Sequence, residues 1–105
     1  MKHTQNLFSY GSLQQEEVQK TILGRTLKGK SALLKGYRIS EKKIYGKYPL
    51  IERSPQPTDS VEGTVFKVSN FELYEIDHYE SEAYQRVRVK LGSGINAWVY
   101  VENLG

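Results

Sequence analysis

Two short stretches of the chain combine residue types that take part in chemistry. The first is the turn Tyr10-Gly11-Ser12-Leu13, where a glycine separates a strand-like run from a helix-like one. Backbone N–H groups at the start of a helix lie at the positive end of its dipole and bind carboxylates or oxyanions. Ser12 has a second interpretation, because Ser12-Leu13-Gln14-Gln15 has the form of a capping box. As a nucleophile Ser12 lacks a local base, since neither His3 nor His78 has a spacing that ties it to Ser12.

The second stretch is Ile76-Asp77-His78-Tyr79-Glu80, followed by Tyr84-Gln85-Arg86. Leu73, Ile76 and Glu80 are spaced i, i+3 and i+7, so Glu80 shares the core-facing side of a predicted helix. Removing a carboxylate from water raises its pKa and makes it a competent base or acid near neutral pH. Two other interpretations stay open: Glu80 forms an ion pair with Arg86 or Arg88, or it is exposed because the helix ends earlier.

Metal and cofactor chemistry is not indicated. Asp77, His78 and Glu80 do not converge on one helix face, so they do not form a metal site. The chain has no cysteine, which excludes disulfides, thiolate nucleophiles, iron–sulfur clusters and cysteine-based zinc sites. The 8 tyrosines serve mainly as packing residues with a polar tip, and the same residue type lines pockets that bind amino-acid groups.

Two helices and several strands are predicted around these stretches. Residues 16–23 carry an apolar stripe and end at Gly24, a residue typical of left-handed helix caps. The capping box at residues 69–72 opens the helix that carries Glu80. Strands are predicted at 6–10, 32–39, 61–68, 86–91 and 97–101, with an extended segment at 48–51 and a loop at 52–60. The last two strands form a hairpin, and because strands outnumber helices the predicted fold class is α+β with a curled or barrel-like sheet.

The chain has 105 residues, of which 38% are hydrophobic, and is predicted to form one domain over residues 1–105. No apolar run approaches the roughly 20 residues that cross a bilayer, so no membrane partner is expected and the cytoplasm is the default location. The net charge of +3 is unevenly spread, since residues 20–53 hold ten Lys and Arg against two acids and residues 54–85 hold one Lys against seven. Such a basic half is more often a solvated face than a nucleic-acid site.

Taken in order, these segments resemble the γ-glutamylcyclotransferase-like family, in particular its AIG2-like branch. Residues 7–13 are similar to the family's opening strand and its Tyr-Gly-Ser/Thr-Leu loop, and residues 48–51 to its Tyr-Pro segment. Residues 61–66 resemble its central strand and residues 97–100 its closing strand. The family signature Leu-x-x-(Leu/Ile)-Asp-x-(Tyr/Phe)-Glu with a later Tyr-x-Arg is matched by Leu73, Ile76, Asp77, Tyr79, Glu80, Tyr84 and Arg86. Any one segment occurs by chance, whereas four in sequence are specific.

The resemblance implies a small mixed β-barrel with flanking short helices and a pocket at one end. It also implies an enzyme without a cofactor, in which the α-amine of a γ-glutamyl amide attacks its own γ-carbonyl and releases 5-oxoproline and a free amine or amino acid. By matching position Glu80 is the general base, the substrate is bound by the turn of Tyr10, Gly11, Ser12 and Leu13, and Tyr84 and Tyr100 line the pocket. The expected partner is a small-molecule γ-glutamyl substrate and no nucleic acid, and the expected assembly is a monomer or weak homodimer.

The chain departs from the family beside the candidate base. Ser81 stands where members often have glycine and Glu82 adds a charge, which leaves the choice of substrate open. A chain of 105 residues has little room for a large specificity loop, which favours an open pocket and a small γ-glutamyl amine. Two other classes stay open: a catalytically inactive ligand-binding homologue, and a single-stranded nucleic-acid-binding barrel that uses the basic stretch and exposed aromatic residues.

Overall fold

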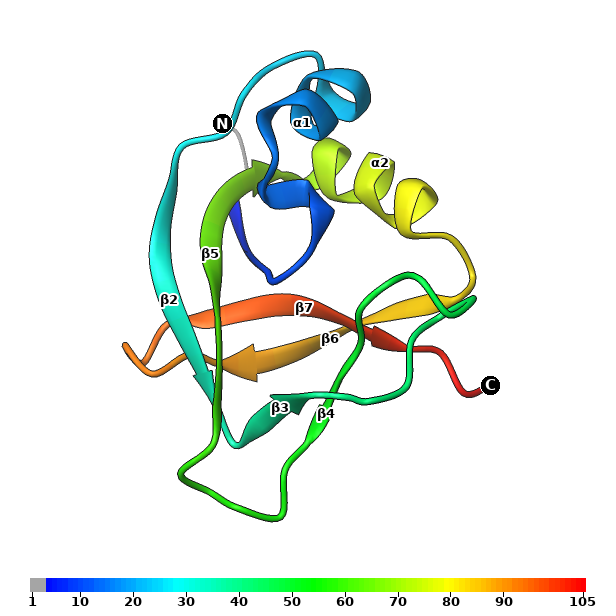
Figure 1. Cartoon of the computed structure of the whole chain (residues 1–105). Helices are drawn as coiled ribbons and strands as arrows, with labels where there is room; N and C mark the ends of the chain where they lie inside the picture. Colours follow the sequence, from blue (N-terminus) through cyan, green and yellow to red (C-terminus); the bar gives the residue numbers. More distant parts are fainter. Residues whose placement is uncertain (1–3) are drawn as a thin grey trace.

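A computed structural model describes residues 4–105 of the chain, and its main element is a five-stranded sheet that curls around its own core (Figure 1). The strand order is β2-β5-β1-β7-β6, and a separate pair, β3-β4, lies beside it. The strands are β1 (Thr4–Ser9), β2 (Gly29–Lys35), β3 (Tyr37–Ile39), β4 (Ile51–Arg53), β5 (Ser60–Ser69), β6 (Tyr84–Lys90) and β7 (Asn96–Glu102). Together with two helices this gives the predicted α+β class.

Strand β5 organises the sheet, because its 10 residues pair antiparallel with both β1 and β2. β1 in turn pairs in parallel with β7, which places the N-terminal strand inside the sheet. The strands approach closely where β5 carries Gly63. A Cβ atom at Gly63 would lie 2.4 Å from the Ser9 carbonyl oxygen and 2.6 Å from the ring of Phe8, so only glycine fits this crossing.

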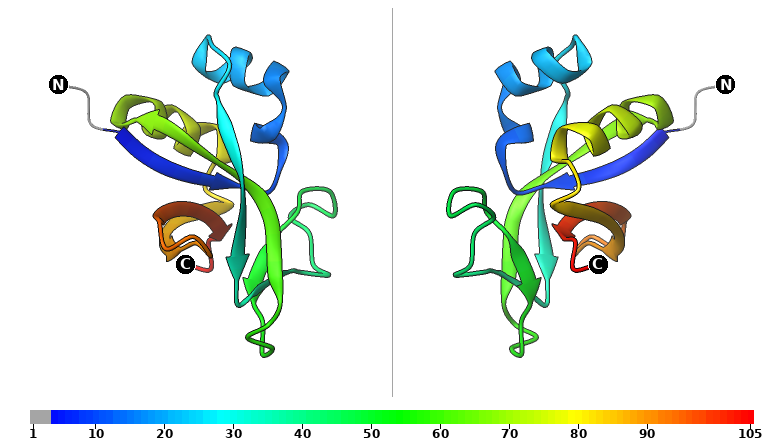
Figure 2. Two further views of the ribbon diagram at one scale, coloured as in Figure 1. Left: turned by 90° about the vertical axis from the view of Figure 1, so that its left-hand side faces the viewer. Right: turned by 90° about the vertical axis from the view of Figure 1, so that its right-hand side faces the viewer.

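The curl brings the two ends of the sheet together without closing a barrel. Among the described residues β2 and β6 do not pair as strands. The Gly92 N–H, just beyond β6, nevertheless donates to the Leu33 carbonyl of β2 at 2.9 Å. The side views of Figure 2 show how steeply the strands cross. The predicted barrel is therefore observed as a strongly curled sheet whose closure by strand pairing is not seen in residues 4–105.

Both helices lie at one end of the sheet (Figures 1 and 2). α1 (Glu16–Leu23) ends, as predicted, at Gly24, whose φ of 73° is left-handed. α2 (Asn70–Glu80) begins with the predicted capping box, in which the side chains of Ser69 and Glu72 each bond the other's backbone N–H. The start of α2 and its direction are therefore set locally, and its last residue is Glu80.

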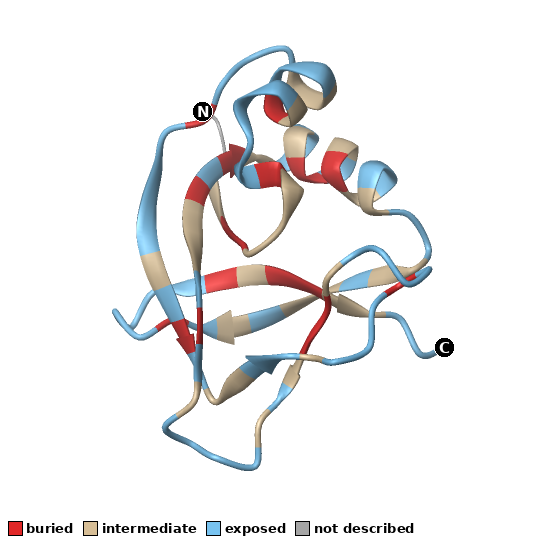
Figure 3. Ribbon diagram, viewed as in Figure 1, coloured by how far each residue is buried: buried red, intermediate tan, exposed pale blue. Residues whose placement is uncertain are grey.

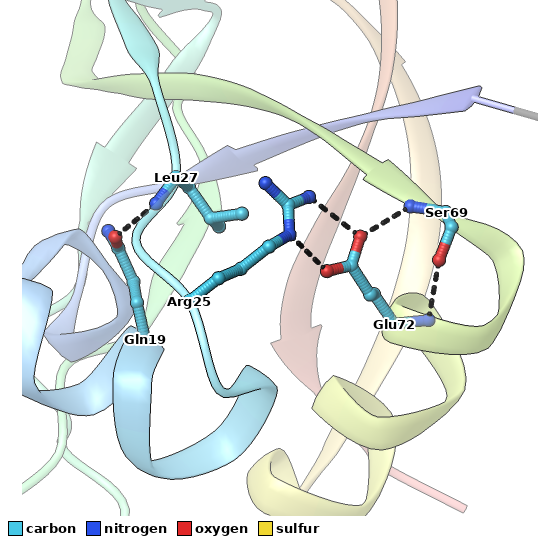
Figure 4. A network of polar contacts seen from close by, with 5 residues as sticks. All are labelled: Gln19, Arg25, Leu27, Ser69 and Glu72. Carbon is cyan, nitrogen blue, oxygen red and sulfur yellow. Dashed lines mark hydrogen bonds and ion pairs between the residues drawn. The ribbon is translucent and has the colours of Figure 1, made fainter.

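A polar junction joins the chain after α1 to the start of α2 (Figure 4). Arg25 donates two hydrogen bonds to the Glu72 carboxylate, at 2.6 and 2.8 Å. The Gln19 side chain is buried and bridges two backbone groups, the carbonyl of Leu13 and the N–H of Leu27. The Gln19 contacts satisfy buried polar groups beside α1, and the Arg25–Glu72 pair lies at the surface.

The buried side chains form two clusters, and Figure 3 shows that buried residues come from both the strands and the helices. Adjacent residues of β1 belong to different clusters, because successive side chains of a strand point to opposite faces. Leu7 packs with the buried residues of α2, Leu73 and Ile76, and Phe8 packs inside the curl with Val99. Burial of both faces of β1 fixes its C-terminal end, and that end leads into the turn Tyr10–Leu13.

Three local predictions are wrong. The single strand over 32–39 is two strands in different sheets, because Gly36, with φ of 82°, turns the chain between them. The loop over 52–60 starts later, since β4 pairs with β3 up to Arg53. The capping box at Ser12 is absent, because Ser12–Gln14 form a short 3-10 helix and α1 starts at Glu16 without a side-chain cap.

His3, weighed above as a base, lies outside the described residues. None of the helices in the part of the chain that the structure describes is long and apolar enough to span a membrane.

Candidate functional site

A cavity of about 310 Å³ opens where the end of β1 meets the end of α2. Its walls come from five places in the chain: residues 7–13, the segment 44–49, residues 79–81 at the end of α2, Ala83 and Tyr84 at the start of β6, and Tyr100 of β7. The curl of the sheet and the docking of α2 therefore bring together segments that are far apart in the sequence.

Glu80 is the last residue of α2 and lines this cavity. Leu73 and Ile76, on the same side of the helix, are 5% and 0% exposed, as the spacing predicted. Burial raises the pKa of the Glu80 carboxyl from its ordinary value of 4.5 to about 7. The helix does not end earlier, so the interpretation of Glu80 as an exposed carboxylate is wrong.

Glu80 has no protein partner among the described residues. No ion pair in residues 4–105 includes it, so the alternative in which Glu80 pairs with Arg86 or Arg88 is wrong. Arg86 instead donates to both oxygens of Asp77, and the Arg88 guanidinium lies over the Trp98 ring at 4.6 Å. The Glu80 carboxyl is therefore left to accept a hydrogen bond from a ligand in the cavity.

Three tyrosine hydroxyls of the cavity wall donate to acceptors other than Glu80. Tyr10 donates to the carbonyl of Tyr100 at 2.7 Å, and Tyr84 donates to the carbonyl of Pro49 at 2.8 Å. Tyr100 donates to Oδ1 of Asp77 at 2.6 Å. Burial raises the pKa of all three phenols, that of Tyr84 to about 12, so they stay protonated near neutral pH. They give the cavity polar walls without supplying a donor to Glu80.

Asp77 binds two of the donors near the end of α2. The Asp77 carboxylate accepts both the Arg86 guanidinium and the Tyr100 hydroxyl. Burial opposes its charge, but the hydrogen bonds from Arg86 and Tyr100 outweigh this effect and hold the pKa of Asp77 below its ordinary value. The Arg86 and Tyr100 donors are therefore bound to Asp77, three residues before Glu80.

The turn Tyr10–Leu13 lies across the cavity from α2. The Ser12 hydroxyl forms a hydrogen bond of 2.6 Å with the Tyr79 hydroxyl, so it ties the turn to the residue before Glu80 and does not cap its own helix. The N–H groups of Ser12 and Leu13 have no hydrogen-bond acceptor among the described residues. They remain available to an anionic ligand, although a single 3-10 turn and not α1 follows them.

The structure brings all the predicted site residues to one cavity: Tyr10, Gly11, Ser12, Leu13, Glu80, Tyr84 and Tyr100. Their roles toward a substrate stay predictions. Tyr45 and Ser81 also line the cavity and were not among them. Nothing in the sequence pattern marks Tyr45, whereas the departure from the family's glycine marked Ser81. No group of three or more His, Cys, Asp or Glu side chains in residues 4–105 is placed to hold a metal ion.

Comparison with known proteins identifies the family of the chain. The sequence model of the family described as "Gamma-glutamyl cyclotransferase, AIG2-like" matches residues 7–104. AIG2-like protein C of Arabidopsis thaliana is 36% identical over 92 residues, which are 86% of this chain and 51% of that protein. The chain therefore spans about half the length of this curated relative.

Solved structures share the fold. A solution structure of a protein from Arabidopsis thaliana matches with a TM-score of 0.83 at 31% identity, over 98% of this chain and 64% of that one. A structure titled gamma-glutamyl cyclotransferase matches with a TM-score of 0.75 at 22% identity, over 95% of this chain and 67% of that one. An uncharacterized human protein matches with a TM-score of 0.75 at 23% identity, over 94% of this chain and 66% of that one. The latter two show the fold alone.

Proposed function

Because the chain belongs to the γ-glutamyl cyclotransferase, AIG2-like family, we propose that it is an enzyme that cleaves a γ-glutamyl amide by internal cyclisation. The nitrogen of the substrate's α-amine forms a bond to the γ-carbonyl carbon, and the bond from that carbon to the amide nitrogen breaks. On becoming the lactam N–H the α-ammonium loses two protons, and the leaving nitrogen gains two and departs as an ammonium group. The products are 5-oxoproline and a free amine or amino acid.

The observation that carries this proposal is the unpaired Glu80 carboxyl. A half-buried carboxyl with a pKa of about 7 takes a proton from an ammonium group and returns it to a leaving nitrogen at neutral pH. The hydroxyls of Tyr10, Tyr84 and Tyr100 are bound to other acceptors, so the Glu80 carboxyl is free to accept a hydrogen bond from the substrate. The α-ammonium of a γ-glutamyl compound is such a donor.

Other features of the cavity support the proposed reaction. A five-membered ring closes intramolecularly, so the enzyme has to fold the substrate and has no nucleophile of its own to supply. The free N–H groups of Ser12 and Leu13 are donors for the substrate's carboxylate or for the oxyanion that develops on the γ-carbonyl. The tyrosines at positions 84 and 100 enclose the glutamyl chain.

The test is detection of 5-oxoproline by mass spectrometry after incubation with a panel of γ-glutamyl amino acids and γ-glutamyl amines. Glu80→Gln is nearly isosteric and should lower turnover at least about 100-fold while the protein stays folded. The matched control is Glu82→Gln, an exposed acid two residues later that does not line the cavity.

Product from the wild type and from Glu82→Gln, but not from Glu80→Gln, would support the proposal. Turnover that is unchanged in Glu80→Gln would refute the proposed mechanism. Absence of product from folded wild-type protein with every amide would favour the ligand-binding homologue instead, and binding of the same amides without turnover would identify it.

A further inference from the structure

A tight turn over Ile44–Lys47 forms one wall of the cavity. Ile44 and Tyr48 exchange two backbone hydrogen bonds, at 2.9 and 3.0 Å, and the Lys47 N–H also donates to the Ile44 carbonyl at 3.0 Å. The two central residues, Tyr45 and Gly46, have φ of 54° and 67°. This is the signature of a type I′ hairpin turn, in which both central residues are left-handed.

Tyr45 is an unusual residue for its place in this turn. Left-handed backbone is common for glycine and tolerated by asparagine or aspartate, whereas a bulky side chain there is an outlier that costs stability. Figure 1 shows the segment 40–50 (green) reaching up from β3 and β4 toward the end of α2. The turn therefore holds a tyrosine beside the cavity at the expense of a strained backbone.

The tyrosines of this wall are open to solvent. Tyr45 is 83% exposed, Tyr48 is 45% exposed and Tyr79, opposite them on α2, is 43% exposed, and all three line the cavity that contains Glu80. If the glutamyl part of a substrate reaches Glu80 and the turn at Ser12, its leaving amine extends outward. The exposed rings lie along that outward path.

The charges near the turn disfavour a cationic leaving group. The Lys47 ammonium already lies 5.5 Å from the centre of the Tyr48 ring, where it occupies the position that a second cation would take. Among the described residues Glu80 is the single acid that lines the cavity, and the proposed mechanism uses it for the α-ammonium. A flat aromatic group interacts favourably with tyrosine rings and needs no counter-ion.

We propose that Tyr45 and Tyr48 form a leaving-group subsite that selects γ-glutamyl amides whose amine carries an uncharged aromatic ring. This inference rests on the proposed function, since it names the substrate class of the same cavity. Tyr45 is the specificity-determining residue, and the chemical steps are those described above.

The experiment compares three amides, γ-glutamyl-2-phenylethylamide, γ-glutamyl-ethylamide and the cationic γ-glutamyl-4-aminobutylamide, by their kcat/KM values. The wild type should prefer the phenylethylamide. Tyr45→Asn should lower kcat/KM for that substrate about three- to tenfold and leave the ethylamide unchanged, because one aromatic pair is lost. Since asparagine accepts left-handed backbone, this variant should be at least as stable as the wild type.

Two matched variants separate the ring from other effects. Tyr45→Phe keeps the ring and should keep the preference. Tyr74→Ala removes a 58% exposed tyrosine of α2 that does not line the cavity. This variant should leave kcat/KM unchanged for all three amides. An equal effect of Tyr45→Asn on the phenylethylamide and the ethylamide would overturn the subsite, as would a wild-type preference for the cationic amide.

Equilibrium binding separates failure of the subsite from failure of the proposed function. Calorimetric titration of the same amides into Glu80→Gln protein measures the subsite without turnover. Tighter binding of the phenylethylamide that is lost in Glu80→Gln/Tyr45→Asn supports the subsite even where the wild type yields no product. Equal binding of the phenylethylamide and the ethylamide to Glu80→Gln protein contradicts it.

Discussion

At the scale of single residues, Glu80 combines burial with the lack of a protein partner, and this makes the stability of the fold depend on pH. A carboxyl whose pKa is about 7 when folded and 4.5 when unfolded binds more protons in the folded chain between these values. The free energy of unfolding should therefore fall as pH rises from about 4.5 to about 7, and then stay at the lower level. With a discount for solvent at the cavity, the loss is on the order of 2 kcal/mol.

Urea unfolding of the wild type and of Glu80→Gln at pH 5 and pH 8 measures this effect. The variant has no carboxyl at position 80, so it should lose less stability than the wild type between the two pH values. Glu72 and Asp77 do not interfere, because their lowered pKa values place their titration below this window. A wild type and variant with the same pH dependence would show that Glu80 is solvated in solution.

Asp77 is the residue we expect to control the pKa of Glu80. Asp77→Asn removes the charge that binds Arg86, and we expect the freed guanidinium to move toward the carboxylate of Glu80. An opposite charge at short range lowers a carboxyl pKa by about one to three units. The acidic limb of the kcat/KM profile should therefore move to lower pH by at least about one unit, with a lower plateau because the base is weaker.

Two further variants distinguish this role from a loss of stability. Glu72→Gln breaks the comparable ion pair with Arg25 on the same helix, away from the cavity, and should leave the acidic limb in place. Asp77→Asn/Arg86→Gln removes the released cation and should return the limb toward the wild-type position. A limb that does not move in Asp77→Asn would mean that Asp77 has a structural role only.

The position of a functional side chain was predictable from the sequence where local spacing decides which face of an element it lies on. The i, i+3, i+7 spacing of Leu73, Ile76 and Glu80 placed the carboxyl on the buried side of α2. The partner of Ser12 was not predictable, because Tyr79 lies 67 residues away and meets it through tertiary packing. The choice of Arg86 between Asp77 and Glu80 depends on side-chain geometry in the same way.

At the scale of secondary structure, the C-terminal end of α2 is strained. Ser81, just after Glu80, has φ of 66° and ψ of −175°, a combination almost confined to glycine. Ser81→Gly should therefore raise the free energy of unfolding by about 1 kcal/mol, after the entropy cost of glycine in the unfolded chain is subtracted. The measurement is the urea midpoint at constant slope.

The end of α1 supplies the opposite control. Gly24 is left-handed at the corresponding position, so Gly24→Ala should lower stability by about 1 kcal/mol. A loss of stability in Ser81→Gly would show that the Ser81 hydroxyl contributes more than the strain costs. Glycine at position 81, where family members often have it, should also leave the pKa of Glu80 unchanged, because burial and not the hydroxyl raises that pKa.

Elements with local start and stop signals were predicted well, and those defined by tertiary contacts were not. The capping box at Ser69 and the glycine at position 24 mark helix ends that the structure confirms. The break of the predicted 32–39 strand at Gly36 depends on which sheet each half joins, and that choice is made by β5 and β4. The α+β class follows from the elements, but the strand order β2-β5-β1-β7-β6 does not.

At the scale of the whole molecule, the curl of the sheet positions the site, and Gly63 permits a close crossing of strands beside it. Gly63 lets β5 cross the end of β1, and this end carries the turn that faces Glu80. A methyl group at position 63 would meet the Ser9 carbonyl oxygen and the Phe8 ring, so the strands have to separate. Gly63→Ala should cost about 3 kcal/mol of stability, at the upper end of overpacking effects.

The same substitution should reduce activity more than its effect on stability explains, because a shift of β1 moves the N–H groups of Ser12 and Leu13 relative to α2. At a temperature where Gly63→Ala is fully folded, kcat/KM for a γ-glutamyl amide should fall at least about tenfold. Gly92→Ala is the control, since a Cβ there has its nearest contact at 3.5 Å and should change stability by less than about 0.5 kcal/mol. Full activity in folded Gly63→Ala protein would show that the turn keeps its place without the close crossing, and that the helix end and not the sheet positions the site.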